Sequence, residues 1–277
     1  MCEFCQKHGE GKKWYLNAKN FSHDLLSDIA RKKFIENFFS EAMGTGFDKL
    51  VKRERIFAKK KRMPANLVTQ FVDASKETHF GQVVPIEDVK KIFEMCSSIS
   101  RIACGCRWAT SKKEERCCFG ITIDPFKWYE KCDTEFFGKP NLQHYEAMTL
   151  AEAMDAVAVH DRQGLIHSVW TFLTPFVGAI CNCDTDGCMA MRHTRGLGMQ
   201  AMFRAEYVAE IDSALCTGCG ACKDICPVSS IDSLEHEKKC RIDKTKCYGC
   251  GVCRTVCATG ALTLKSRASD PVASATW

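Results

Sequence analysis

The sequence predicts an α+β protein in two parts, a helix-rich, cysteine-containing N-terminal domain followed by a small module built around two cysteine runs. Two observations support this. Residues 216–257 contain one cysteine spacing twice, whereas the first two hundred residues contain segments of helical periodicity. We expect a helical region at residues 1–100, a cysteine-rich α/β region at 101–205 that forms one unit with it, and the C-terminal module at 206–277.

Cysteine is far more frequent than in ordinary proteins, at 20 of 277 residues. Disulfides, metal sites and iron–sulfur clusters are the three explanations to separate. The N-terminal residues contain no apolar segment with a cleavage site, so a signal peptide is not expected. The longest nearly apolar stretch, 165–181, is interrupted by His167 and Pro175 and is short for a membrane span. We therefore expect a cytoplasmic chain without a membrane span, in which thiols hold metal rather than form disulfides.

Three helices are expected in the N-terminal part. Thr149 and Glu152 form a T-x-x-E capping box at the start of one, and Gly164 ends it. Pro85 opens another. The predicted ranges are 21–39, 86–96 and 150–162, and the segment 101–140 is expected to be loop-like.

The two C-terminal runs carry the most specific signal. Each reads C-x2-C-x2-C-x3-C, and the second repeats the first 31 residues later. A 4Fe-4S cubane needs four converging thiolates, and a tight loop with two-residue gaps supplies three of them. The fourth cysteine of each run ligates the other cluster in this arrangement. Zinc is the alternative, but zinc sites rarely need three cysteines at such gaps plus an offset fourth.

The segment 206–265 resembles a bacterial-type ferredoxin with two 4Fe-4S clusters, with "EYVAEID" and "ALTLK" as its flanking strands. Ala258 replaces the proline that usually follows the eighth cysteine, which removes no ligand. The resemblance implies a cluster I held by Cys216, Cys219, Cys222 and Cys257, and a cluster II held by Cys247, Cys250, Cys253 and Cys226.

Eight further cysteines fall in three short parts of the N-terminal unit: Cys104, Cys106, Cys117, Cys118, Cys132, Cys181, Cys183 and Cys188. Asp184 and Gly187 predict an irregular loop that lets Cys181 and Cys183 point at one site, and Cys188 precedes a short predicted helix. The segments "ACGCRW", "CCFG", "GLIH" and "CNC" resemble poorly characterised cysteine-rich iron–sulfur proteins of anaerobes. This resemblance implies an additional cluster or metal ion held by some of Cys104, Cys106, Cys118, Cys181, Cys183 and Cys188. The alternative is a core of reduced cysteines.

Other candidates carry weaker signals. His167 and His193 are candidate ligands or proton donors, although each residue type is more often an ordinary hydrogen-bonded histidine. Cys2, Cys5 and His8 form a half-site suited to zinc or iron. Cys240 fits neither run and is expected to be a free thiol.

Charge adds a modest constraint. The formal charge of +5 falls to about +1 when two oxidised cubanes, each −2 with its thiolates, are counted. The run from Lys49 to Arg62 holds eight basic residues and one acid. Such a run is most often one solvated face of a helix, and it lacks the interleaved aromatic residues of single-strand binders. Nucleic acid is therefore not an expected partner.

The sequence predicts an iron–sulfur electron-transfer protein, a carrier or oxidoreductase subunit, that exchanges electrons with redox partner proteins. The alternative is an oxidoreductase with catalysis at the N-terminal metal site, fed by the ferredoxin module, with Arg107, His167 and Arg192 as its polar groups. A redox sensor that binds nucleic acid is the third hypothesis. Phosphate-loop and dinucleotide-binding fingerprints are both lacking in the sequence.

Overall fold

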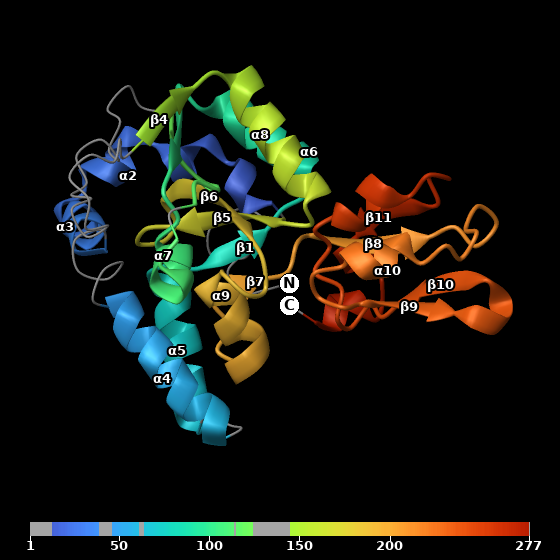
Figure 1. The fold of residues 1–277 in the computed structure, drawn as a ribbon. Coiled ribbons are helices and arrows are strands. Elements are labelled where there is room, and N and C mark those ends of the chain that lie inside the picture. Colours follow the sequence, from blue (N-terminus) through green and yellow to red (C-terminus); the bar gives the residue numbers. More distant parts are fainter. Residues whose placement is uncertain (1–12, 39–45, 61–63, 114, 124–144, 277) are drawn as a thin grey trace.

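The computed structural model describes residues 13–38, 46–60, 64–113, 115–123 and 145–276. A seven-stranded sheet with helices on both faces forms the larger part, and the C-terminal module packs beside it (Figure 1). The predicted α+β class is confirmed.

The large sheet has the strand order β4-β2-β3-β6-β5-β1-β7. Its neighbours pair antiparallel, except β1 and β7, which are parallel. The boundary predicted at residue 100 falls inside β2, and the region before that boundary also contains β1. The strands are β1 Gly81–Val83, β2 Ser98–Ile102, β3 Cys118–Thr122, β4 Tyr145–Met148, β5 Ile166–Thr171, β6 Val177–Cys183 and β7 Met202–Phe203.

Helices α6 (Ile86–Met95) and α8 (Leu150–Arg162) cover one face of the sheet. Both were predicted from the sequence and both are confirmed. Thr149 and Glu152 make the two reciprocal hydrogen bonds of the capping box, which satisfy backbone N–H groups at the start of α8. Val89, Ile92 and Val157 pack with Ile180 of β6 in the core below these helices.

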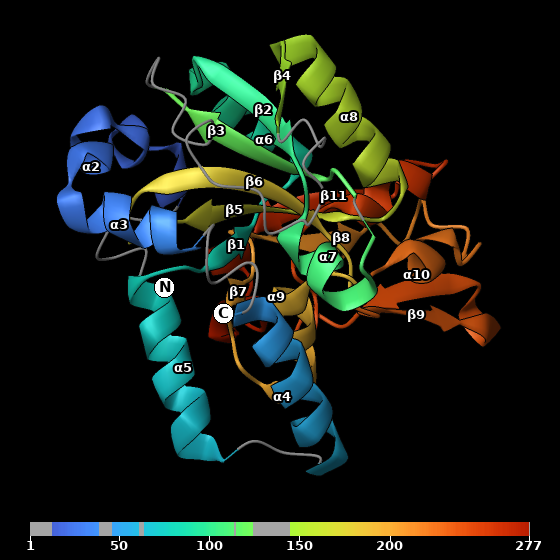
Figure 2. The same cartoon turned by 60° about the vertical axis from the view of Figure 1, so that its left-hand side comes forward.

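The opposite face of the sheet packs against the second large core, with Trp170 and Ala179 of the sheet, Ile35 and Met191. Figure 2 shows α4 and α5 extending away from the sheet on this side. The helices here are α2 His23–Ser27, α3 Ile29–Asn37, α4 Phe47–Lys60, α5 Ala65–Glu77, α7 Gly105–Ser111 and α9 Met189–Arg192, followed by the π-helix η6 His193–Leu197. The 3-10 turns η1 Trp14–Leu16 and η2 Ala18–Phe21 precede α2.

Two expectations for this region are corrected. The helix predicted over 21–39 is divided at Asp28, which leaves helical backbone angles and caps α3 through the Arg31 N–H. The described part of 101–140 is not loop-like, because it contains α7 and β3. Strand β3 pairs with both β2 and β6, so hydrogen bonds from the sheet order this segment. The segment is too short for its own residue pattern to reveal a strand.

The part of the basic run that the structure describes, 49–60, lies on α4, where Lys49, Lys52 and Arg55 are exposed, in accord with a solvated helix face.

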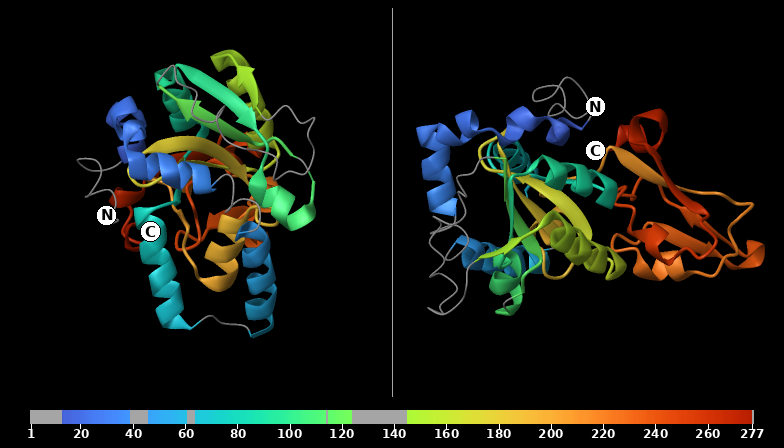
Figure 3. Two further views of the ribbon diagram at one scale, coloured as in Figure 1. Left: turned by 90° about the vertical axis from the view of Figure 1, so that its left-hand side faces the viewer. Right: turned by 90° about the horizontal axis from the view of Figure 1, so that it is seen from above.

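The C-terminal module consists of two antiparallel strand pairs linked by cysteine loops. Its first and last strands, which lie in the two segments predicted as flanking strands, pair with each other. Figure 3 shows the module alongside the sheet when the molecule is viewed from above. Its elements are β8 Tyr207–Ile211, α10 Ala221–Ile225, β9 Ile231–Leu234, η7 Glu235–Glu237, β10 Lys239–Ile242, η8 Val252–Val256, β11 Leu262–Ser266, η9 Arg267–Ser269 and η10 Ala273–Ala275.

Among the described residues, none of the helices has the length and apolar character to cross a membrane.

Candidate iron–sulfur centres

The two cysteines of "CNC" are on a strand, not in the irregular loop predicted from Asp184 and Gly187. Both belong to β6, and alternation along a strand places Cys181 and Cys183 on the same face, opposite Ile180. The two thiols therefore face the same site from one strand, and their side chains contact each other.

Six cysteines of the N-terminal unit form a closed ring of side-chain contacts. Register in the sheet sets Cys118 of β3 opposite Cys181, while Cys104 and Cys188 are the residues that immediately precede α7 and α9. The contacts run Cys104–Cys106–Cys188–Cys183–Cys181–Cys118 and back to Cys104. We call this set the six-cysteine ring. It consists of the six residues that the sequence predicted as metal ligands, and Cys117 contacts Cys104 from outside it.

Two members of the ring favour the thiolate. Hydrogen bonds from Cys106, Cys117 and Cys118 hold the pKa of Cys104 well below its usual range. Hydrogen bonds from Cys181 and Cys188 lower the pKa of Cys183 to about 6. The pKa values of the other four ring thiols are raised through hydrogen bonds to neighbouring cysteines and burial, so only Cys104 and Cys183 favour the thiolate, the form that binds metal.

No group of three or more His, Cys, Asp or Glu side chains within the described residues is arranged to hold a single metal ion. That holds equally for the cysteines of the C-terminal runs. In a cubane each thiolate binds its own iron atom, whereas a single tetrahedral ion takes four ligands at one point. Six soft thiol donors are more than one such ion needs, and they suit an iron–sulfur cluster.

Arg107 places a buried positive charge at the edge of the ring. Its guanidinium donates to Cys117 Sγ and Asp184, and Nε lies 2.9 Å from a carboxylate oxygen of Glu115. The side chain of Arg107 is only 6% exposed, so these charges act in a poorly screened environment. A cation there stabilises negative charge on the neighbouring thiols.

The two candidate histidines lie in different places. His167 is fully buried, with Nδ1 2.6 Å from Asn182 Oδ1 and Nε2 3.4 Å from Asp161 Oδ1, on the sheet face away from Cys181 and Cys183. His193 follows α9, and its Nε2 lies 3.9 Å from Glu54 Oε2. Arg192 donates to the other carboxylate oxygen of Glu54 at 2.9 Å.

The C-terminal cysteines line two separate cavities. One is lined by Cys216, Cys219, Cys222 and Cys257 together with Cys240, whose thiol contacts Cys222. The second is lined by Cys226, Cys247, Cys250 and Cys253. In each cavity the fourth cysteine of one run accompanies the first three of the other. Gly218 and Gly249 have φ values of +71°, and a Cβ atom there would overlap backbone atoms of Lys238 and Tyr207, respectively, so only glycine fits these loops.

Comparison with known families identifies this module. Residues 215–261 match the family described as 4Fe-4S dicluster domain. The matched segment contains all eight cysteines of the two runs, so the C-terminal domain is of ferredoxin type, which supports 4Fe-4S binding and an iron–sulfur electron-transfer role. Neither the curated proteins nor the solved structures gave a match to the chain.

Sequence reasoning missed His79 and Asn182, which line the same cavity as the ring, and Glu54, which contacts Arg192 and His193. His79 sits in a segment without a recognisable motif, whereas Asn182 lies inside "CNC" and Glu54 inside the basic run, and the contacts of all three arise only through tertiary packing. The candidate half-site of Cys2, Cys5 and His8, and the cysteine at position 132, lie outside the described residues.

Proposed function

We propose that the protein transfers electrons through three iron–sulfur clusters, two in the ferredoxin-type module and one in the six-cysteine ring. The observation that carries the third cluster is the ring itself, in which six thiols from three chain segments contact one another. Six neighbouring thiols without metal would leave a reactive group of cysteines in a protein with redox clusters.

Within the module, the two cavities support the crossed assignment. Cluster I takes Cys216, Cys219, Cys222 and Cys257, and cluster II takes Cys247, Cys250, Cys253 and Cys226. Clusters of this type pass single electrons at low potential.

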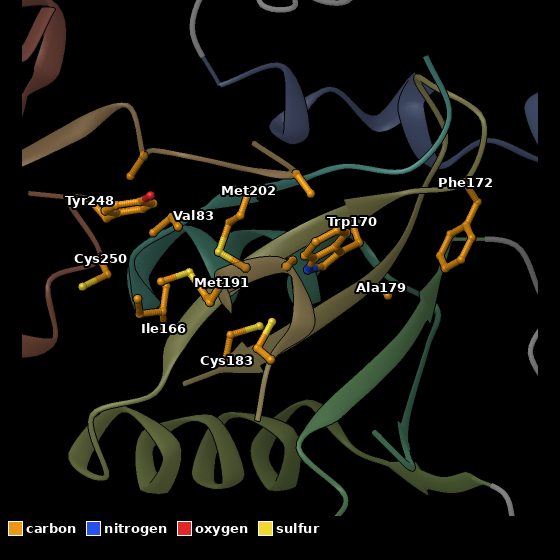
Figure 4. Close-up of a cluster of buried hydrophobic side chains, with 14 of the residues drawn as sticks. Val83, Ile166, Trp170, Phe172, Ala179, Cys183, Met191, Met202, Tyr248 and Cys250 are labelled. Carbon is orange, nitrogen blue, oxygen red and sulfur yellow. The ribbon is translucent and has the colours of Figure 1, made fainter. Parts of the chain in front are cut away.

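The route of electrons follows from burial. Cys219, a ligand of cluster I, is exposed to solvent, whereas Cys250 of cluster II is buried in the same apolar core as Cys183 and Cys188 of the ring. Figure 4 shows Met191 and Ile166 between Cys183 and Cys250 in this core. Redox partner proteins therefore meet cluster I, and cluster II relays electrons to the ring.

One observation favours the second candidate, an oxidoreductase with catalysis at the ring. The six cysteines line a cavity rather than a closed core. The polar groups first suspected for that role, Arg107, His167 and Arg192, are instead engaged with Asp184, Asn182 and Glu54.

Metal analysis of the full chain, purified without oxygen, tests the proposal. We expect about eight iron and eight sulfide per chain from the module, and additional iron from the ring. Cys183→Ser should lower only the iron above eight, because Cys183 contacts both Cys181 and Cys188. EPR spectra of the reduced protein should lose one signal in parallel.

Cys96→Ser is the matched control for that measurement. Cys96 is half-buried and lies outside the ring, where its thiol donates to the Ile92 carbonyl. Its replacement should leave the iron content unchanged. Zinc in place of iron would overturn the assignment of the module, and eight iron in wild type and Cys183→Ser alike would overturn the third cluster.

Single substitutions at the fourth cysteines test the crossed ligation. Cys226→Ser should perturb the cluster held by Cys247, Cys250 and Cys253, and Cys257→Ser the other one. Because Cys219 is exposed, cluster I should react faster than cluster II with a soluble oxidant such as ferricyanide. The EPR signal that changes first is then assigned to cluster I, and the slower one to cluster II. If Cys226→Ser alters the fast-reacting signal alone, the ligation is not crossed.

A further inference from the structure

The six-cysteine ring forms one wall of a cavity of about 280 Å³ between the sheet, α4 and α5. Aromatic side chains form much of the rest of its lining: Phe38, Phe47, Phe71, Trp170 and Phe172. We call this part of the cavity the aromatic chamber. α4 and α5, which extend from the sheet in Figure 2, supply Phe47 and Phe71.

The cavity is larger than a cluster held by the six thiols would fill. A dry apolar cavity of about 150 Å³ binds benzene in a well-studied engineered protein, and the present cavity is nearly twice as large. A cluster seated on the thiols would occupy one end. The aromatic end then retains space on the order of one six-membered ring.

The lining selects against charge. Among the described residues that line the cavity, Arg107 is the one that carries a permanent charge, and its guanidinium is already paired with Asp184 and Glu115. An anionic ligand would lose its hydration without gaining a free cation, and it would face the negative charge of the thiolates. The chamber therefore suits an uncharged ligand.

His79 contributes a polar ring to the lining of the chamber, alongside the side chains of Ser75 and Thr78. Its Nδ1 lies 2.5 Å from the Thr171 carbonyl and donates to it, so Nε2 on the other edge of the ring keeps its lone pair. The imidazole packs against Phe38, with ring centroids 4.3 Å apart, and against Trp170, at 4.8 Å. Burial lowers the pKa of His79 to about 4, so the ring is neutral near pH 7.

We propose that the aromatic chamber binds an uncharged, single-ring aromatic ligand that carries one hydrogen-bond donor, with the ligand ring among Phe38, Trp170 and Phe172 and its donor directed to His79 Nε2. This inference rests on the proposed function, because the proposed cluster in the six-cysteine ring is what would lie next to the bound ligand. The cluster would then face a small molecule and would not only pass electrons between other clusters.

Phenol is the probe, titrated calorimetrically into the full holoprotein. Wild type should bind it, and Ser75→Phe should weaken binding at least tenfold, because Ser75 is a buried residue of α5 that lines the cavity. Ala74→Phe adds the same ring at the neighbouring exposed position and should bind phenol like wild type.

His79→Phe tests the hydrogen bond to His79 Nε2 without filling the cavity, in contrast to Ser75→Phe. It keeps a ring against Phe38 and Trp170 but removes Nε2, so phenol should bind about fivefold more weakly while toluene is unaffected. In NMR spectra of the reduced wild-type protein, the ring protons of phenol should relax faster than they do when phenol is mixed with the Ser75→Phe variant. The reason is that bound phenol would lie next to a paramagnetic cluster.

The outcomes separate the two proposals. If wild type does not bind phenol, if Ser75→Phe binds it normally, or if benzoate binds as tightly, the chamber is not the site we propose. If phenol binding follows these variants but the iron content is only eight, the chamber stands and the third cluster fails. Should Ser75→Phe not fold, the phenol and toluene affinities of His79→Phe decide the question.

Discussion

Gly249→Ala is expected to prevent assembly of cluster II, with a loss of about four iron per chain. Gly249 has φ +71°, and a Cβ atom there would overlap the Tyr207 carbonyl oxygen of β8. A backbone atom cannot move aside as a side-chain end can. The loop that carries Cys247 and Cys250 would therefore have to leave β8, and its thiolates would leave the cluster with it.

Gly260→Ala is the matched control. Gly260 also has a positive φ, +66°, but its added methyl group meets no described atom within 4 Å. The change should cost about 1–2 kcal/mol of backbone strain and leave iron binding intact. Iron and sulfide per chain and the visible absorbance of the clusters make the comparison. Equal cluster contents in the two variants would show that the contact with Tyr207 is not what requires glycine at position 249.

Arg267→Met is expected to destabilise the holoprotein by about 3–5 kcal/mol. Arg267 is fully buried, and its guanidinium donates to the carbonyls of Ala205, Cys247, Ala273 and Thr276. Methionine fills a similar volume but leaves these buried carbonyl oxygens without their donors. The midpoint of thermal unfolding should fall by roughly 6–15 °C for a chain of this size.

Arg254→Met serves as its control. Arg254 also joins distant segments, with hydrogen bonds of 2.6 and 2.9 Å to Glu87 of α6, but Glu87 is half exposed. Solvent screens such a pair, so the loss should be below about 1 kcal/mol. A fall in the unfolding midpoint as large as that of Arg267→Met would contradict the view that burial sets the difference. The iron content of Arg267→Met should be measured at the same time, because Cys247 is one of its partners.

Local patterns predicted part of the N-terminal fold well. The capping box of Thr149 and Glu152 and the proline before α6 act within a few residues, so the sequence reveals them directly. The prediction of one continuous helix was wrong at Asp28. The side chain of Asp28 caps a new helix there, although the apolar periodicity continues across the break. The prediction of a loop-like segment was wrong at Cys118, because β3 is ordered by its neighbours β2 and β6 rather than by its own residues.

The sequence by itself determined the C-terminal module. Two or three residues separate its successive cysteines, so one short loop supplies most of the ligands of each proposed cluster, and a repeat of that spacing is recognisable without any fold. The sequence also named six N-terminal cysteines from which the ligands of one further site would come, but not how they meet. Only the tertiary structure set Cys118 opposite Cys181, placed Cys181 and Cys183 on one strand face, and brought Phe38, Phe71 and His79 to the same cavity. The physical reason is range: a loop closes over a few residues, whereas the six-cysteine ring and the chamber depend on strand register and helix packing between segments far apart in the chain.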